Sequence, residues 1–306
     1  MSEQKRPLLI LLTGPTAVGK TELCIQLAES FDTEILSCDS RQFFKEMNIG
    51  TAVPSDLELS RVKHHFIQHI SLEQDYSVGK YELDALEVLE SLFKNKELAF
   101  VTGGSGMYHQ TLLYGIDDIP ATSVEVREKV EGIFRDEGLE KLQILVQEID
   151  PEFWETVDQN NHRRLMRTLE VFYMSGRNLT YFQKYKKAKS RPFDVLKIAI
   201  TRDREELYTR INKRVDMMLK EGLEDEVKSV LGFRHKKAIN TVGYKEFLSY
   251  FDGEITYERC VELIKQNTRR YAKKQMTWIR REKDIHVFSP DQKQEIIELI
   301  KTKREE

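Results

Sequence analysis

The sequence predicts an α/β fold, in which a parallel sheet forms the core and a helical domain is inserted into that core. An apolar run, 8–12, leads directly into a glycine-rich loop and then into a helical pattern of apolar residues. Further apolar runs at 34–38, 98–101 and 195–200 alternate with helical patterns, which is typical of a parallel sheet covered by helices. The stretch 121–190 has no convincing strand pattern and contains helical patterns instead. It therefore predicts a helical domain that precedes the last strand.

Composition limits the class of protein. The chain has 306 residues, which is enough for one large domain and a smaller one. Its hydrophobic content of 40% and charged content of 32% are ordinary for a soluble globular protein. The three cysteines, Cys24, Cys38 and Cys260, have neither metal-ligand nor disulfide spacing, so we expect a reducing cytoplasm. No signal peptide, transit peptide or membrane-spanning stretch is evident, and we expect a monomer with no membrane partner.

The loop after the first apolar run has the pattern of a phosphate-binding loop. It consists of Gly14, Pro15, Thr16, Ala17, Val18, Gly19, Lys20 and Thr21. The glycines allow the backbone to wrap closely around an anion, and the first amides of the following helix point free N–H groups toward it. Lys20 supplies a mobile positive charge, and the Thr21 hydroxyl can hold Mg²⁺. The loop predicts a polyphosphate site with Mg²⁺ as cofactor, without specifying which polyphosphate.

Two further segments are expected at the carboxyl edge of the same sheet. Asp39 directly follows the run 34–38, at the edge where ligands bind in parallel sheets. Its carboxylate could hold Mg²⁺ in a nucleoside triphosphatase, accept a proton from an amine in a transferase, or cap a helix. Its nearness to the phosphate-binding loop favours a role in the site. A glycine-rich turn, 102–108, follows the run 98–101 and predicts a second wall.

Taken in order, these motifs resemble those of the tRNA dimethylallyltransferases, also called tRNA isopentenyltransferases. The resemblance runs nearly end to end and rests on the segments 14–21, 39–42, 47–52, 103–108, 161–165, 210–215, 242–244 and 275–278. Ser105 stands where that family usually has threonine, and it keeps the hydroxyl. His162 and Arg163 stand where the family often has glutamine and proline, so the resemblance does not define the RNA contacts there.

The resemblance implies a reaction and a fold. A dimethylallyl group passes from dimethylallyl diphosphate to N6 of the adenine 3′-adjacent to the tRNA anticodon (position 37), giving N6-dimethylallyladenosine and diphosphate. The fold it implies is a P-loop NTPase-like core formed by 1–120 and 191–306, with C-terminal helices, and an insertion domain, 121–190, that contacts the anticodon stem-loop. The catalytic residues it implies are Asp39, Thr21, Arg214 and Ser105.

In this interpretation each half of the reaction has its own residues. Asp39 orients the adenine amine and accepts its proton. Arg214 stabilises the departing diphosphate together with the loop, and Arg210 lies on the same helix face and assists. The competing interpretation of Arg210 and Arg214 is an ordinary solvated helix face.

The RNA side also has support from charge. The tRNA-binding residues that we predict are Asp39, Ser40, Arg41, Gln42, Ser105, Arg127, Gln159, Asn160, Asn161, His162, Arg163, Arg164 and Arg167. The stretch 161–191 is strongly basic with a single acid, Glu170, and has interleaved aromatics that can stack on unpaired bases. The stretch 265–281 is also basic, whereas 117–158 is rich in acids. A slightly acidic protein can thus present a basic groove to RNA, although each stretch alone also fits a solvated helix.

Three alternatives stay open. A nucleotide or metabolite kinase would use the same loop for ATP. A non-catalytic RNA-binding protein would retain the loop without using it, and an isopentenyltransferase acting on free adenine nucleotides would not need the basic stretches. His64, His65 and His69 are close enough to suggest zinc, but the ligand set is incomplete, so we expect structural roles.

Overall fold

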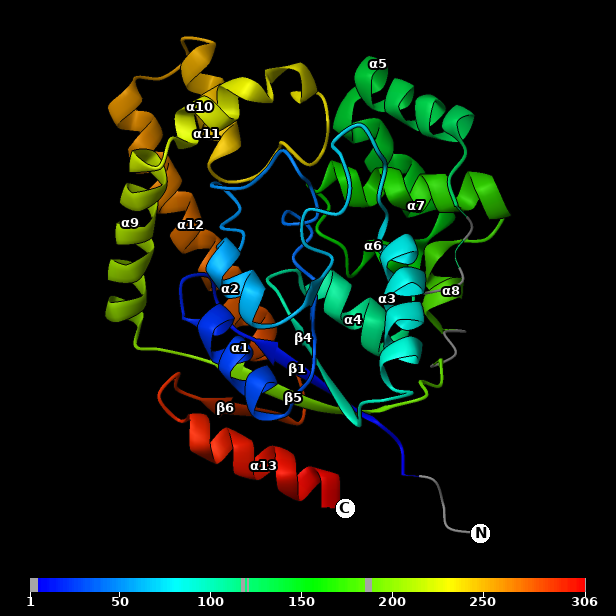
Figure 1. Ribbon diagram of the computed structural model, residues 1–306. Coiled ribbons are helices and arrows are strands. Elements are labelled where there is room, and N and C mark those ends of the chain that lie inside the picture. Colours follow the sequence, from blue (N-terminus) through cyan, green and yellow to red (C-terminus); the bar gives the residue numbers. More distant parts are fainter. Residues whose placement is uncertain (1–4, 117–118, 120, 185–188, 306) are drawn as a thin grey trace. The chain divides into compact units, whose positions relative to one another are not determined.

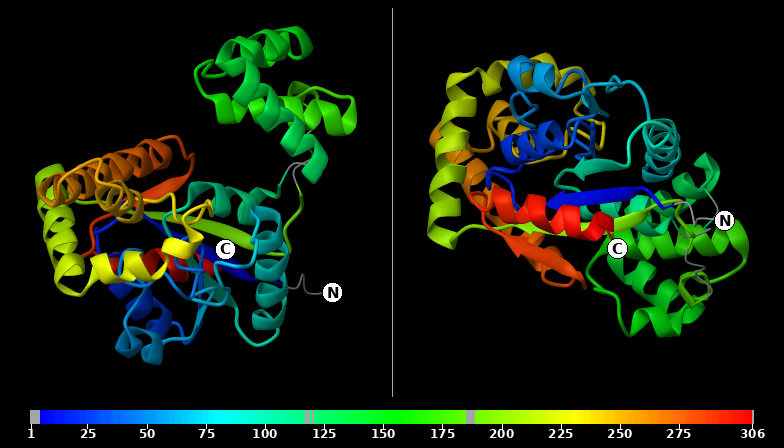
Figure 2. Two further views of the ribbon diagram at one scale, coloured as in Figure 1. Left: turned by 90° about the horizontal axis from the view of Figure 1, so that it is seen from above. Right: turned by 60° about the horizontal axis from the view of Figure 1, so that its bottom comes forward.

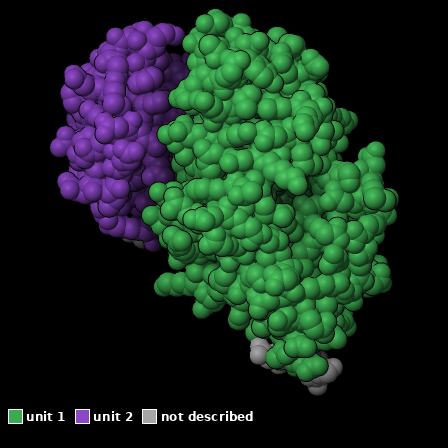
Figure 3. Space-filling model, turned by 90° about the vertical axis from the view of Figure 1, so that its left-hand side faces the viewer, with its two compact units in different colours: residues 1–114, 191–306 green, residues 115–190 purple. Residues whose placement is uncertain are grey.

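The computed structural model describes residues 5–116, 119, 121–184 and 189–305. They form two compact units: Met1–Tyr114 with Arg191–Glu306, and Gly115–Ser190 (Figure 3). The predicted boundary at 121 is wrong by a few residues. The last core helix before the second unit ends at Tyr114, where Gly115 adopts a left-handed backbone conformation with φ 84° and ends the helix.

A six-stranded parallel sheet forms the centre of the first unit (Figure 1). Its strands are β1 (Leu8–Thr13), β2 (Ile35–Ser37), β3 (His64–His65), β4 (Leu98–Thr102), β5 (Asp194–Ile200) and β6 (Ile285–Phe288). Their order is β3-β2-β4-β1-β5-β6. The four predicted strands are present as β1, β2, β4 and β5, and the structure adds an edge strand at each side. Because β6 follows β5 in sequence, the insertion precedes the last two strands of the sheet, and not only one as expected.

Helices cover both faces of this sheet. The helices of the first unit are α1 (Lys20–Ser30), α2 (Asp56–Arg61), α3 (Val78–Leu92), α4 (Gly106–Tyr114), α9 (Arg204–Lys220), α10 (Leu223–Ser229), the 3₁₀ helix η1 (Leu231–Phe233), α11 (Tyr244–Phe251), α12 (Tyr257–Ile279) and α13 (Lys293–Glu305). Successive residues of β1 point to opposite faces. Leu9 and Leu11 pack in the core with α3 and α4, whereas Ile10 and Leu12 pack with α1 and α13. In Figure 2 (right), α13, which is drawn in red, lies over the strands. Burial on both faces explains why these strands are continuous apolar runs.

The strand register brings three loops to one edge of the sheet. Leu12 of β1 pairs with Thr102 of β4, and Thr102 also pairs with Ser37 of β2. The strands therefore end side by side, and the chain that leaves each of them begins at the same level. The loop after β1, the segment that starts at Cys38 and the turn after β4 consequently meet, as predicted for parallel strands.

The second unit has helices and no strand among its described residues. It contains α5 (Val124–Ile149), α6 (Pro151–Trp154), α7 (His162–Ser175) and α8 (Leu179–Lys184). Helix α5 is interrupted at Gly138, which has φ 76°. The core consists of apolar residues of α5 and α7, with Val157 between them: Val130, Leu142, Val146, Val157, Leu165 and Leu169. Gly176 ends α7 in the left-handed conformation, with φ 67°.

No helix in the described part of the chain has the length and apolar character needed to cross a membrane.

Candidate active site

The loop between β1 and α1 has the geometry of an anion-binding loop. Gly14 is required because a Cβ there would lie 2.5 Å from the carbonyl oxygen of Ile200 on β5. Gly19 has φ 106°, which favours glycine, and it precedes the first turn of α1. The Nζ of Lys20 folds back and donates to the carbonyl oxygens of Gly14 and Pro15, at 2.8 Å each.

Lys20 is a cation with little water around it. Burial lowers its pKa to about 8, the positive charge of Arg214 adds to this, and the carboxylate of Asp39 opposes it. Burial also lowers the pKa of Arg214, again against the effect of Asp39. Two poorly hydrated positive charges beside free helix-terminal amides favour binding of an anion.

The back of the loop is held by side chains from distant parts of the sequence. The backbone N–H of Thr16 donates to Oε1 of Gln275 at 2.9 Å. The Nε of Arg210 donates to the carbonyl oxygen of Ala17, and the Nε of Arg202 to that of Val18, both at 2.8 Å. Arg210 is exposed, and its hydrogen bond supports the loop backbone from outside.

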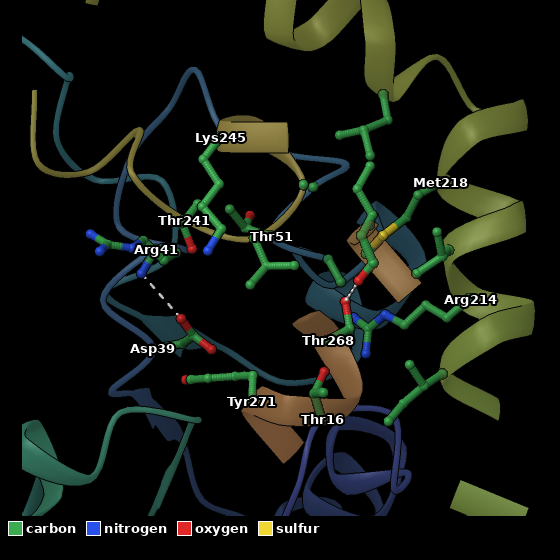
Figure 4. A pocket seen from close by; sticks show the side chains of 18 of the residues that line it. Thr16, Asp39, Arg41, Thr51, Arg214, Met218, Thr241, Lys245, Thr268 and Tyr271 are labelled. Carbon is green, nitrogen blue, oxygen red and sulfur yellow. Dashed lines mark hydrogen bonds between the residues drawn. The ribbon is translucent and has the colours of Figure 1, made fainter. Parts of the chain in front are cut away.

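Asp39 directly follows β2 and its neighbour Cys38, in a turn rather than at the start of a helix. Its Oδ1 accepts from the backbone N–H of Arg41 at 3.1 Å, and its carbonyl oxygen accepts from that of Gln42 at 3.0 Å (Figure 4). The helix-cap interpretation is therefore wrong. Ser40 and Ser105 join the two walls, since their hydroxyl oxygens lie 3.1 Å apart.

Three connected hollows surround these groups. The first, about 420 Å³, is lined at its polar part by Asp39, Ser40, Arg41 and Ser105, and at its apolar part by Ile211, Val215, Met218, Leu223, Val242 and Ile264. The second, about 90 Å³, is lined by Lys20, Thr21 and Asp39. The third, about 950 Å³, is lined by Lys20 and Thr21 and by residues of α2 and α9. Arg214 lines all three, so its guanidinium lies where they meet.

Helix α12 supplies further site residues. The sequence identifies Tyr271 only as part of a basic stretch, whereas Gln275 and Trp278 lie in the segment 275–278 of the resemblance. Tyr271 and Gln275 both donate to the carbonyl oxygen of Gly104, at 3.1 and 3.2 Å. The indole of Trp278 packs so closely on Gly106 that a Cβ there would lie 3.0 Å from Nε1. The spacing 271, 275 and 278 marks one helix face, which is the signal that could have identified them.

The first hollow also has residues that the sequence does not predict. Thr241 and Lys245 line it, and Figure 4 shows both side chains near Arg41. They flank the segment 242–244 of the resemblance, and no segment of the resemblance includes either of them.

Gln42 has a role different from the predicted base contact. Its Nε2 donates to the carbonyl oxygens of Thr51 and Ala52, at 3.2 and 2.9 Å. The side-chain amide thus holds the neighbouring loop.

The donor set fits Mg²⁺ bound mainly through substrate. Thr21 and Asp39 offer oxygens to the same small hollow, and Mg²⁺ commonly combines a few protein oxygens with phosphate oxygens and water. Within the described ranges, no group of three His, Cys, Asp or Glu side chains could hold a metal. His65 bonds Glu34 at 2.6 Å, His64 bonds the carbonyl of Val62, and His69 packs against aromatic rings.

The predicted RNA contacts of the second unit fall into two groups. Exposed residues free to meet a ligand by their position are Arg127, Gln159, Asn160, Arg163 and Arg164. The others take part in the unit's own structure: Asn161 caps α7, His162 stacks on Phe134 with ring centroids 4.7 Å apart, and Arg167 pairs with Glu170 at 3.3 Å. Tyr185, Lys186 and Lys187 lie outside the described residues.

Comparisons with known proteins show which family this chain belongs to. The family model described as IPP transferase matches residues 42–282. A tRNA dimethylallyltransferase 1 of Bacteroides thetaiotaomicron is 48% identical over 295 residues, covering 96% of each chain. The chain belongs to the IPP transferase family. A tRNA dimethylallyltransferase of Christiangramia forsetii is 45% identical, covering 93% of this chain and 94% of that relative.

Solved structures of this family have the same fold. The full-length tRNA isopentenylpyrophosphate transferase of Bacillus halodurans aligns with a TM-score of 0.73 and 32% identity, covering 98% of this chain and 97% of that one. A eukaryotic dimethylallyltransferase acting on tRNA aligns with a TM-score of 0.79 and 27% identity, covering 93% of this chain and 74% of that one. The predicted P-loop NTPase-like parallel core is confirmed.

Proposed function

We propose that this IPP transferase uses dimethylallyl diphosphate to prenylate N6 of the adenine 3′-adjacent to the anticodon of tRNA. One observation supports this above all. The desolvated cation of the phosphate-binding loop and the Asp39 carboxylate line the same small second hollow. The first hollow, which has apolar lining residues, shares Asp39 and Arg214 with it. The loop suits a diphosphate leaving group, the first hollow a short hydrocarbon, and the carboxylate an amine.

The positively charged residues act on the diphosphate leaving group. As the bond between C1 of the dimethylallyl group and the diphosphate oxygen breaks, negative charge grows on that oxygen. Lys20, Arg214 and the amides at the start of α1 stabilise it. Mg²⁺ held by Thr21 and the phosphate oxygens would add Lewis-acid charge there.

The amine is activated on the opposite side. The N6 lone pair is delocalised into the adenine ring, so the amine is a weak nucleophile. Asp39 orients the amine and takes its proton as the bond between N6 and C1 forms. Ser105 and Ser40 hold the wall beside it through their shared hydrogen bond. The products are N6-dimethylallyladenosine and diphosphate, and the proton ends on the Asp39 carboxylate before passing to water.

The RNA must present the adenine unstacked, so that its N6 can reach Asp39. Exposed basic residues of the second unit are suited to the stem-loop backbone. As part of the proposal, the enzyme acts as a monomer in the cytoplasm, in keeping with three buried free cysteines.

The test is direct. The protein is incubated with dimethylallyl diphosphate, Mg²⁺ and bulk tRNA, and the tRNA is digested to nucleosides. We expect N6-dimethylallyladenosine, and none with Lys20→Ala. Phosphate transfer from ATP to a small molecule, with no prenylated nucleoside, would instead support the kinase alternative.

A further inference from the structure

The segment 47–53 forms a wall shared by the three hollows, although it is neither helix nor strand. Thr51 and Ala52 line both the first and the second hollow, and Asn48, Ile49 and Ala52 line the third. Ala52 has φ 51°, a left-handed conformation that costs energy for a residue with a side chain. Such a segment keeps this shape only if its surroundings hold it.

A single carboxylate on α10, that of Glu226, accepts hydrogen bonds from the backbone N–H groups of this wall segment. Oε2 of Glu226 accepts from the backbone N–H groups of Asn48, at 3.0 Å, and Ile49, at 2.6 Å. Oε1 accepts from the N–H of Gly50 at 2.9 Å and from the hydroxyl of Tyr244 at 2.5 Å. Hydrogen bonds to a charged acceptor are the strong ones, and here they fix consecutive amides at once.

Two other contacts also hold the wall segment 47–53 in place. A Cβ on Gly50 would lie 2.5 Å from the ring of Tyr244, so the backbone packs directly against the ring that donates to Glu226. On the opposite side, the amide of Gln42 holds the carbonyl oxygens of Thr51 and Ala52. The wall is therefore bound through its amides by Glu226 and through its carbonyls by Gln42.

We propose that Glu226 is a positioning residue for prenyl transfer. It fixes the position of the wall segment 47–53, and this segment holds the dimethylallyl group between the phosphate-binding loop and Asp39. Glu226 itself lines none of the three hollows. This inference rests on the proposed function, because it assumes that the diphosphate donor occupies these hollows. A shift of about 1 Å in a positioning wall can lower a rate by roughly 10²-fold.

The test uses Glu226→Gln, which keeps the shape but replaces one acceptor oxygen by an amide donor facing the N–H groups. Tyr244→Phe is the milder second variant, since it removes only the hydroxyl. Asp225→Asn is the matched control: it is the preceding residue on α10, its side chain is 85% exposed, and its ion partner Lys228 is 3.6 Å away. Each full-length variant is assayed for kcat and KM with dimethylallyl diphosphate and tRNA, for hydrogen exchange of 48–53, and for thermal unfolding.

We expect Glu226→Gln to lower kcat/KM for dimethylallyl diphosphate by about 10-fold or more. The amides 48–50 should exchange faster, and the Kd for tRNA should stay within about twofold. Tyr244→Phe should shift the same parameters less, and Asp225→Asn should match the wild type. A purely structural role would lower the unfolding temperature while leaving kcat/KM of the folded enzyme unchanged, and that result would overturn the inference. If Glu226→Gln does not fold, normal kinetics and exchange in Tyr244→Phe would also overturn it. A wild type that transfers no prenyl group would refute the proposed function instead.

Discussion

Asp39 is the residue whose chemical role can be separated from its structural one. Asparagine at this position keeps an oxygen that can accept from the N–H of Arg41, so the turn is retained. It cannot accept a proton from the adenine amine. We expect Asp39→Asn to lower turnover by about 10²-fold or more while tRNA binding persists. Single-turnover transfer and a tRNA binding assay measure the two effects. Unchanged turnover would remove Asp39 from the role of base.

Lys20 predicts how diphosphate binding depends on pH. In the free protein its pKa is lowered to about 8, mainly by burial. A bound anion raises that pKa, so above pH 8 binding requires the uptake of a proton. Because inorganic diphosphate also titrates in this range, the slope is read against Lys20→Met: above pH 8 the affinity of the wild type should fall by up to tenfold more per pH unit. Calorimetry across this range checks the slope, and Lys20→Met should flatten it. An equal slope in that variant would assign the proton to another group.

Arg214 should act on the diphosphate alone. Its guanidinium lies where the three hollows meet, and burial lowers its pKa. Arg214→Ala should raise the KM for dimethylallyl diphosphate by about 10-fold or more, because the variant has no charged donor for the phosphate oxygens. Its Kd for tRNA should hardly change. Lys220→Ala, an exposed residue in the last turn of α9, is the control. Weakened tRNA binding with a normal KM for the diphosphate would place Arg214 on the RNA.

At the scale of elements, the exposed arginines of helix α7 can be tested for a role in tRNA binding. Arg163 and Arg164 are exposed in its first turn, whereas Arg167 pairs with Glu170 and serves the fold. Replacing Arg163 and Arg164 by glutamate should weaken tRNA binding and reduce its salt dependence by roughly one unit of slope for each phosphate that the protein no longer neutralises. Arg135→Glu on α5 is the control, because it makes the same change per residue at an exposed position. An unchanged salt slope in the double variant would place the RNA elsewhere.

The sequence predicts some elements better than others for physical reasons. Strands β1, β2, β4 and β5 are recognisable because burial on both faces makes them continuous apolar runs. Strand β3 has two residues and β6 has exposed positions, so neither has such a run. Local periodicity cannot identify edge strands this short.

The same distinction applies to the site. The residues predicted at strand ends, Asp39 and Ser105, do line the pocket, because parallel topology requires it. Glu226 and Tyr271 lie outside every segment of the resemblance and could not be predicted, since each meets its partner across a large separation in sequence. The sequence suggests an RNA contact for Gln42 because of its position in a motif. That position does not show where the side-chain amide points, and in the structure the amide donates to the carbonyl oxygen of Ala52.

At the scale of the whole molecule, the account requires both units to recognise one substrate. The first unit contains the reaction pocket, and the second has exposed basic residues that a free nucleotide would not need. An adenine alone offers few groups to read, so the stem-loop around it must supply most of the specificity.

The most direct test compares two acceptors for the same dimethylallyl diphosphate. One is an anticodon stem-loop with adenine 3′-adjacent to the anticodon, and the other is free AMP. The account predicts efficient transfer to the stem-loop, very poor transfer to AMP, and none when that adenine is replaced by guanine, which has an oxygen in place of the reacting amine. Comparable kcat/KM for AMP and the stem-loop would contradict it.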